Sequence, residues 1–239
     1  SCDTSPAAVV RFAKKLGFKG FTSLKLDLAR ESAQAAPDAF NSAIQESDDL
    51  AAIIRKAEKT HQRNTSLTYQ MINIATLQSA VDALCDARRV FLFGVGASGL
   101  LAMDFQYKCS RIGIPAFYQM DSHTSLASAA LLSEHDAAIA ISYSGTTRET
   151  LLAAQSAHDR GAKVVAVTQG NRNPLARLAD FPLCIPSEES EMRIGAMTSR
   201  NSGLLVLDLL YLGCVQKNAP QSQKSLEKTR ALIHELRNE

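Results

Sequence analysis

The sequence has no apolar run near the roughly 18 residues of a membrane-spanning helix. Residues 1–30 lack the continuous apolar core of a signal peptide. The five cysteines lie far apart without a C-x-x-C pair, which excludes a disulfide framework and a zinc knuckle. Neither sign of charge dominates, since 26 Lys and Arg stand against 24 Asp and Glu. With 46% apolar and 21% charged residues, the 239-residue chain is typical of a globular protein in a reducing cytoplasm. We expect no metal and no other cofactor.

Charge is nevertheless uneven along the chain. Residues 1–30 hold six bases and two acids, a formal charge of +4, whereas the remainder has a formal charge of −2. Such a basic head suggests contact with a polyanion, although a solvated helix face would carry the same charges.

A short helix is predicted over residues 5–16. Ser5 suits the N-cap, Pro6 the first helical position and Gly17 the end of the helix. One face is apolar, through Val9, Phe12, Ala13 and Leu16. The bases off that face are Arg11, Lys14 and Lys15. Small residues at the start of a basic helix permit close approach to a major groove, so DNA binding is one interpretation.

The residues between the head and the main body are predicted to be helical after a linker. A second short segment with apolar anchors is predicted over residues 22–31. Residues 32–46 are mostly small or polar, and we interpret them as a linker. Ser47 is expected to cap a helix that runs through Met71, and another helix begins near Thr76. His61 is expected at the surface.

From residue 88 the pattern alternates between apolar strands and helices. The predicted strands are 89–94, 116–120, 136–145, 163–170 and 181–187; the predicted helices are 98–112, 123–132, 147–162, 173–180 and 198–216. This alternation predicts an α/β fold with a parallel sheet covered on both faces. With the strand order 2-1-3-4-5, the loops after the first and third strands would meet in one crevice.

Those two loops have the composition of an anion site. The first runs from Gly94 to Ser98, and the second is Ser142-Tyr143-Ser144-Gly145-Thr146-Thr147. Glycines allow close approach of the backbone, and a helix N-terminus with neighbouring hydroxyls favours a phosphate. The simpler alternative is that the hydroxyls only cap the following helix.

Dinucleotide binding is a rival interpretation of the first loop. Gly94-x-Gly96-x-x-Gly99 has the required spacing after a strand. The acid expected at the end of the second strand is offered only by Asp121, and the serine-rich loop has no role in that scheme.

The head resembles a known family. The string SPAAVVRFAKKLGFKGFTSLKLDLA, residues 5–29, is similar to the recognition helix and following helix of RpiR-type transcriptional regulators. The resemblance implies that earlier helices are missing from this chain and that residues 1–4 end the turn. It also implies DNA contacts from Ser5, Ala7, Ala8, Arg11, Lys14 and Lys15.

The body resembles the SIS, or sugar isomerase, domain. GVGAS at 94–98 and AISYSGTTRETL at 140–151 carry that resemblance. It implies a five-stranded, flavodoxin-like parallel sheet that binds phosphorylated sugars. It implies contacts from Ser98, Ser142, Tyr143, Ser144, Gly145 and Thr147. The residues themselves add Gly96, Thr146, His123 and Glu191 to the predicted effector site, although His123 could equally be a packed histidine and Glu191 part of a solvated charge run.

The combination predicts a phosphosugar-sensing transcriptional regulator rather than an enzyme. An isomerase remains the alternative and would need a base. The candidates are His123, Glu149, Glu188, Glu189 and Glu191, and Arg193 could reach the sugar oxygens. None of these forms a persuasive acid–base pair.

The expected organisation has three parts. They are a partial helix-turn-helix domain with linker (1–45), connecting helices (46–87) and the SIS domain (88–239). Residues 196–213, also similar to the last domain helix of these regulators, are apolar on nearly every face. We therefore expect that helix to be buried against the sheet and a second subunit, in at least a homodimer.

Overall fold

The computed structural model describes residues 6–15, 20–21, 44–170, 172–186 and 195–235. The chain divides into two compact units. The first comprises residues 1–53 with 190–194, and the second comprises residues 54–189 with 195–239.

In the first unit, helix α1 (Pro6–Lys15) confirms the helix predicted over residues 5–16. Proline stands at its first position, where a missing N–H costs no hydrogen bond. Ala13 is buried as expected, but Phe12 of the predicted apolar face is 59% exposed. Arg11 and Lys15 are exposed. The second stretch predicted at 22–31 lies outside the described residues, as does most of the linker.

The second unit is built on the predicted sheet. Its strands are β1 (Arg89–Phe93), β2 (Ala116–Tyr118), β3 (Asp136–Ile141), β4 (Lys163–Gln169) and β5 (Phe181–Ile185). All pairs are parallel and the order is β2-β1-β3-β4-β5, which confirms the predicted order. β2 and β3 end earlier than predicted, at Tyr118 and Ile141.

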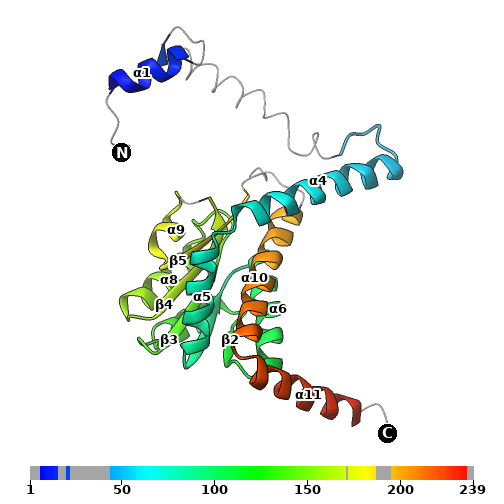
Figure 1. Cartoon of the computed structure of the whole chain (residues 1–239), viewed down its shortest axis with the longest axis vertical. Coiled ribbons are helices and arrows are strands. Elements are labelled where there is room, and N and C mark those ends of the chain that lie inside the picture. The colour runs from blue at the N-terminus through cyan, green and yellow to red at the C-terminus, as the bar shows by residue number, and fades with distance from the viewer. Residues whose placement is uncertain (1–5, 16–19, 22–43, 171, 187–194, 236–239) are drawn as a thin grey trace. The chain divides into compact units, whose positions relative to one another are not determined.

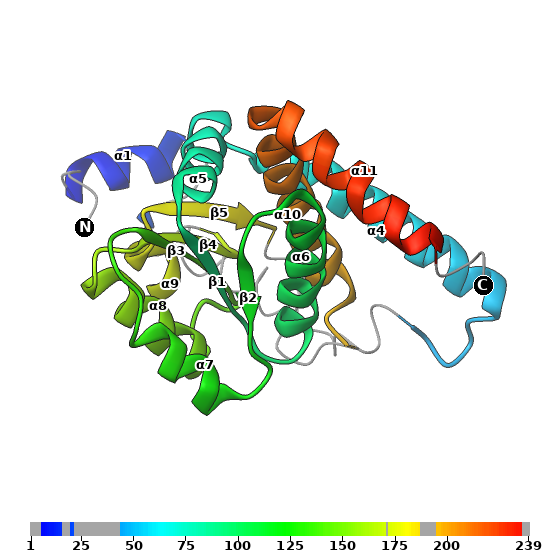
Figure 2. The same cartoon turned by 90° about the horizontal axis from the view of Figure 1, so that it is seen from below.

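Helices cover both faces of this sheet (Figures 1 and 2). One face carries α5 (Ile74–Asp86), α6 (Ala97–Ile112) and α10 (Met197–Lys217), and the other carries α7 (Ser122–Ala129), α8 (Arg148–Asp159) and α9 (Pro174–Leu178). Each face has its own apolar core. All six residues of β3 are buried, as expected of a central strand covered on both sides.

Two further helices are α4 and α11. α4 (Leu50–Met71) is the long connecting helix, and the side chain of Asp49 accepts a hydrogen bond from the Ala52 N–H at 2.6 Å. One first-turn N–H group therefore has the Asp49 side chain as its partner, and the prediction that Ser47 caps this helix is wrong. His61 is exposed, as predicted. α11 (Ala219–Glu235) packs on α6 and was not predicted.

A buried polar cluster joins α4 to α10. The Asn64 Nδ2 donates to Ser202 Oγ at 2.5 Å and to the Thr198 carbonyl at 3.0 Å. The hydroxyls of Thr68 and Ser202 lie 2.8 Å apart. Because polar groups need partners when buried, these bonds fix how α4 lies along α10.

α10 is buried in part in the core of its face of the sheet, and its contact with a second subunit stays a prediction. Val206, Leu207 and Leu210 are buried, but Leu212 is exposed.

Cys109 and Cys214 are buried, and burial raises the pKa of the Cys109 thiol to about 12. Cys184 is half-buried, and its thiol donates to the Gly170 carbonyl. No helix within the described ranges is long and apolar enough to cross a bilayer.

Candidate functional site

The serine-rich loop lies at the carboxyl end of β3, where α8 begins. Its hydroxyls form two pairs: Ser142 Oγ lies 2.9 Å from Thr147 Oγ1, and Thr146 Oγ1 donates to Ser144 Oγ at 2.9 Å. Ser142 is buried, whereas Ser144 and Thr146 are exposed. The loop therefore has an anchored inner pair and an outer pair that a ligand can reach.

The hydroxyls do not simply cap α8. Thr147 occupies the N-cap position, but its side chain makes no capping hydrogen bond. The first N–H groups of a helix have no acceptor within the helix, and the helix dipole favours an anion there. Glu149 lies in this first turn and is exposed. The geometry thus suits an external anion better than the capping alternative.

Gly145 is the residue that lets the loop close. It has a φ of +66°, and its N–H donates to the carbonyl and the hydroxyl of Ser142, both at 3.1 Å. A side chain there would collide with Asn173. Asn173 caps α9 and its amide donates to the Gln169 carbonyl, while the Leu175 N–H donates to the Gly145 carbonyl. The start of α9 therefore holds the serine-rich loop in place at Gly145. The sequence analysis did not identify Asn173 as a residue that supports this loop.

The glycine-rich loop lies at the carboxyl end of β1. Gly96 has a φ of +59° and is the N-cap residue of α6, and Ser98 in the first turn is half-buried. Across the sheet edge, the Tyr118 hydroxyl donates to the Gly94 carbonyl at 3.2 Å. Burial raises the pKa of this phenol, so it stays protonated as a donor. Since β1 and β3 are neighbours, both predicted loops stand at one edge of the sheet.

The structure weakens the dinucleotide interpretation of this loop. A side chain at Gly99 would collide with the ring of Tyr118, so packing alone explains the third glycine. Asp121 accepts hydrogen bonds from the N–H and the hydroxyl of Thr124 and so caps α7. The backbone hydrogen bond from Thr124 lowers the pKa of Asp121. The Asp121 carboxylate therefore serves as the N-cap of α7, which explains its presence without a ribose.

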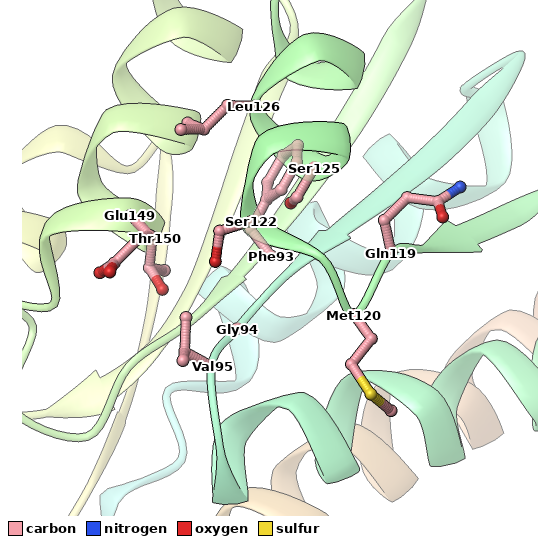
Figure 3. Close-up of a pocket in the computed structure, with 10 residues that line it drawn as sticks. All are labelled: Phe93, Gly94, Val95, Gln119, Met120, Ser122, Ser125, Leu126, Glu149 and Thr150. Carbon is pink, nitrogen blue, oxygen red and sulfur yellow. The ribbon is translucent and has the colours of Figure 1, made fainter.

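A small hollow of about 10 Å³, room for about one water molecule, opens between these elements (Figure 3). It is lined by Phe93, Gly94, Val95, Gln119, Met120, Ser122, Ser125, Leu126, Glu149 and Thr150. The residues come from the ends of β1 and β2 and from the first turns of α7 and α8. None of the predicted effector residues is among these ten, but several predicted residues adjoin them in the chain.

The remaining predicted residues are placed as follows. His123 is exposed in the first turn of α7, next to Ser122. Tyr143 is half-buried and packs against the apolar core of the α10 face. The acidic loop with Glu188, Glu189, Glu191 and Arg193 lies outside the described residues. Among the described residues, no group of three or more His, Cys, Asp and Glu could hold a metal ion.

The predicted DNA contacts are placed only in part. Arg11 and Lys15 are exposed one turn apart on α1, and Ala8 is half-buried. Ser5, and the side chains of Ala7 and Lys14, fall outside what the structure describes.

Comparison with known families supports both halves of the interpretation. Residues 83–213 match the SIS domain, and residues 1–35 match the helix-turn-helix domain of the rpiR family. An uncharacterized HTH-type transcriptional regulator of Caldanaerobacter subterraneus is 37% identical over 233 residues. That alignment covers 98% of this chain and 82% of the relative.

Solved structures give the same picture of the fold. The NanR protein of Vibrio vulnificus, complexed with ManNAc-6P, has a TM-score of 0.73 and 28% identity, covering 98% of this chain and 82% of NanR. The sugar isomerase domain of an RpiR transcription factor from Sphaerobacter thermophilus has a TM-score of 0.68 and 21% identity, covering 75% and 98%. A phosphoheptose isomerase of Francisella tularensis has a TM-score of 0.59 and 22% identity, covering 71% and 100%. The last two show the shared fold alone.

Proposed function

The chain belongs to the RpiR family of helix-turn-helix transcriptional regulators with a SIS domain, and we propose that a phosphorylated sugar in the crevice of that domain controls its binding to DNA. The effector must bind the DNA-binding and non-binding states with different affinity. The phosphate would lie on the loop from Ser142 to Thr147, with Gly96 and Ser98 across the crevice. His123, Tyr143 and Glu191 would be candidates for contacts with the sugar.

The observation that carries this proposal is the loop before α8. It offers the exposed hydroxyls of Ser144 and Thr146 beside a helix N-terminus whose N-cap side chain makes no capping bond. Neutral donors and a favourable dipole together suit a phosphate. The complex of NanR with ManNAc-6P adds support, because that relative carries a phosphosugar on the same fold.

The DNA side of the proposal rests on α1. Its exposed bases Arg11 and Lys15 would contact phosphates or guanine edges, together with Ser5, Ala7, Ala8 and Lys14. Since the bacterial chromosome lies in the cytoplasm, we expect the protein to act there. The boundaries at residues 45 and 87 between head, connecting helices and SIS domain remain a prediction.

The direct test measures the binding of the intact regulator to DNA from upstream of its own gene by fluorescence anisotropy. We expect salt-dependent, sequence-specific binding that one phosphosugar changes about 5-fold to 150-fold. Specific binding that no phosphosugar alters would contradict the proposed sensing. Absence of any specific binding would contradict the regulatory role of the head.

We also propose a sensor rather than a sugar-phosphate isomerase. An isomerase needs a positioned base, and the described candidates His123 and Glu149 are both exposed. Incubation with a panel of aldose and ketose phosphates should give no conversion. Conversion that His123→Ala or Glu191→Gln abolishes would support the enzyme instead.

A homodimer is the assembly we propose. Large apolar side chains are exposed on α6 and on and just after the edge strand β2: Leu100, Met103, Tyr107, Phe117 and Met120. A patch of this kind is typical of an interface, and a two-fold dimer would suit a pseudo-palindromic operator. Light scattering should give twice the chain mass, and Tyr107→Asp should lower it to that of one chain. A monomeric wild type at micromolar concentration would contradict this assembly.

A further inference from the structure

Cys85 and Cys214 are a pair of thiols that lie outside the two candidate loops. Cys85 is the last residue but one of α5, and Cys214 lies near the end of α10. Cys85 is half-buried, Cys214 is buried, and both are free thiols. The two thiols are hydrogen-bonded to each other. Two reduced sulfurs in contact are the reactants from which a disulfide forms.

The helices α5 and α10 approach each other closely around this pair. α10 has a glycine at position 213, and a side chain there would collide with Val81 of α5. One turn further along α10, the Lys217 ammonium lies 2.8 Å from the Asp82 carboxylate and 3.3 Å from that of Asp86. These contacts hold the helices together on both sides of the two sulfurs. Because a disulfide needs Cα atoms about 4.4–6.8 Å apart, such close packing is what allows one to form without a large backbone movement.

The groups around Cys85 favour its thiolate, which is the reactive form of a cysteine. The hydrogen bond from Cys214 and the positive charge of Lys217 lower the pKa of Cys85. Burial and the carboxylates of Asp86 and Asp82 oppose this effect without cancelling it. The same hydrogen bond raises the pKa of Cys214, which stays protonated. The pair is therefore asymmetric, with one thiol suited to attack an oxidant and the other placed beside it as a proton donor.

The other cysteines that the structure describes lack this arrangement. Cys109 is only 1% exposed, and burial raises the pKa of its thiol to about 12, so it stays protonated. Cys184 donates to the Gly170 carbonyl, and burial raises the pKa of its thiol as well. Among the described cysteines, Cys85 is therefore the one most open to oxidation.

We propose that Cys85 and Cys214 form a peroxide-reactive dithiol site that closes to a reversible disulfide between α5 and α10. The oxidant is hydrogen peroxide or an organic hydroperoxide. Among proteins of a reducing compartment, the disulfides that do form are usually transient ones of this kind. The site does not involve the candidate phosphate loop, so the inference stands apart from the proposed sensing of a phosphosugar.

The reaction has two steps. The Cys85 thiolate attacks one peroxide oxygen, so that an S–O bond forms and the O–O bond breaks, and the departing hydroxide or alkoxide takes a proton from water. The Cys214 sulfur then attacks the Cys85 sulfur, so that the S–S bond forms and the S–O bond breaks. The hydroxide that leaves takes the Cys214 proton and becomes water. Two electrons pass from the sulfurs to the peroxide, and a dithiol reductant reverses the change.

Peptide mapping by mass spectrometry tests the site. The fully reduced chain is treated with a small excess of hydrogen peroxide, blocked with N-ethylmaleimide and digested without reductant. We expect one linked pair of peptides that contains Cys85 and Cys214, loss of two of the five thiols, and recovery of both with dithiothreitol. Linkage of Cys85 to Cys109 instead, or oxidation without any linkage, would overturn the proposal.

Single replacements separate the roles of the two thiols. Cys214→Ser should stop the reaction at the Cys85 sulfenic acid, which dimedone traps, whereas Cys85→Ser should leave Cys214 unmodified. Cys184→Ser is the matched control and should form the disulfide at the wild-type rate. Where Cys214→Ser does not melt cooperatively, Cys214→Ala takes its place. Dimedone labelling of Cys214 in Cys85→Ser, as fast as that of Cys85 in Cys214→Ser, would overturn the assignment of Cys85 as the attacking thiol.

A second pair of variants distinguishes charge from packing. Lys217→Gln and Asp82→Asn break the same ion pair but change the charge near Cys85 in opposite directions. At pH 7, Lys217→Gln should therefore slow disulfide formation several-fold, and Asp82→Asn should accelerate it. Equal changes of rate in the two variants would mean that packing alone sets the rate and would overturn the electrostatic activation of Cys85.

Discussion

The Ser144 hydroxyl is the residue-scale feature on which phosphate binding depends most. It is exposed and accepts from the N–H and the hydroxyl of Thr146. In Ser144→Ala we expect phosphosugar affinity to fall by about 1–3 kcal/mol, the scale for losing a partner of a charged group. Calorimetry measures this loss, and Ser66→Ala, at an exposed position on α4, is the control. Unchanged affinity would move the phosphate elsewhere.

Asp136 is the first residue of β3, at the end of the sheet opposite the serine-rich and glycine-rich loops. Its buried carboxylate accepts from both Arg89 nitrogens at 2.9 and 3.0 Å, from Arg88 and from Ser133. The Arg89 hydrogen bonds hold the pKa of Asp136 well below its usual range. Asp136→Asn should therefore destabilise the fold by about 1–3 kcal/mol at pH 7, whereas the exposed Asp159→Asn should not.

The pH dependence of that loss follows from the lowered pKa. A carboxylate with a lowered folded-state pKa stabilises fully above its unfolded pKa of about 3.9, and this is lost as pH falls through the folded value. Urea midpoints of wild type and Asp136→Asn should thus differ by a constant amount from pH 7 to about pH 5. Below about pH 4 they should converge, and a gap that widens there would refute the assignment.

For single residues, the sequence predicts which side chains could bind a phosphate better than it predicts which residues pack against them. The hydroxyls of Ser142, Ser144, Thr146 and Thr147 were recognisable because they follow a strand and precede a helix. Asn173 was not, since it looks like an ordinary helix-start residue in the sequence. Its importance comes from tertiary packing, which places it against Gly145.

At the scale of elements, the pairing of α4 with α10 depends on buried hydrogen bonds. Replacing Asn64 removes one hydrogen-bond partner from Ser202 and one from the Thr198 carbonyl. Asn64→Leu should cost about 1–3 kcal/mol in urea unfolding. Gln62→Leu, on the exposed side of the same helix, should stay within about 0.5 kcal/mol. Equal effects of the two substitutions would mean that the buried cluster contributes nothing specific.

The sequence predicted the strands, their order and most helices, because alternation of apolar runs and turn residues is a strong local signal. Its errors follow from weaker signals. α11 is polar and short of apolar periodicity, and packing on α6 stabilises it instead. The start of α4 was misplaced because three adjacent residues, Ser47, Asp48 and Asp49, are all good caps. In the structure Asp49 makes the capping hydrogen bond, to the Ala52 N–H, whereas Asp48 accepts from the Gln45 N–H.

At the scale of the whole molecule, α4 contributes residues to both compact units. In the second unit its residues are hydrogen-bonded to α10, whose first residue follows the acidic loop by a few positions.

The most direct test of the central claim is isothermal titration of this chain with a phosphosugar and with its unphosphorylated parent. The account predicts saturable binding of the phosphosugar, loss of most affinity in Ser144→Ala, and no measurable binding of the parent sugar. Binding of the parent sugar as tight as that of its phosphate would contradict the phosphate loop as the basis of recognition. Cooperative melting with no binding of any phosphosugar would contradict the sensor itself.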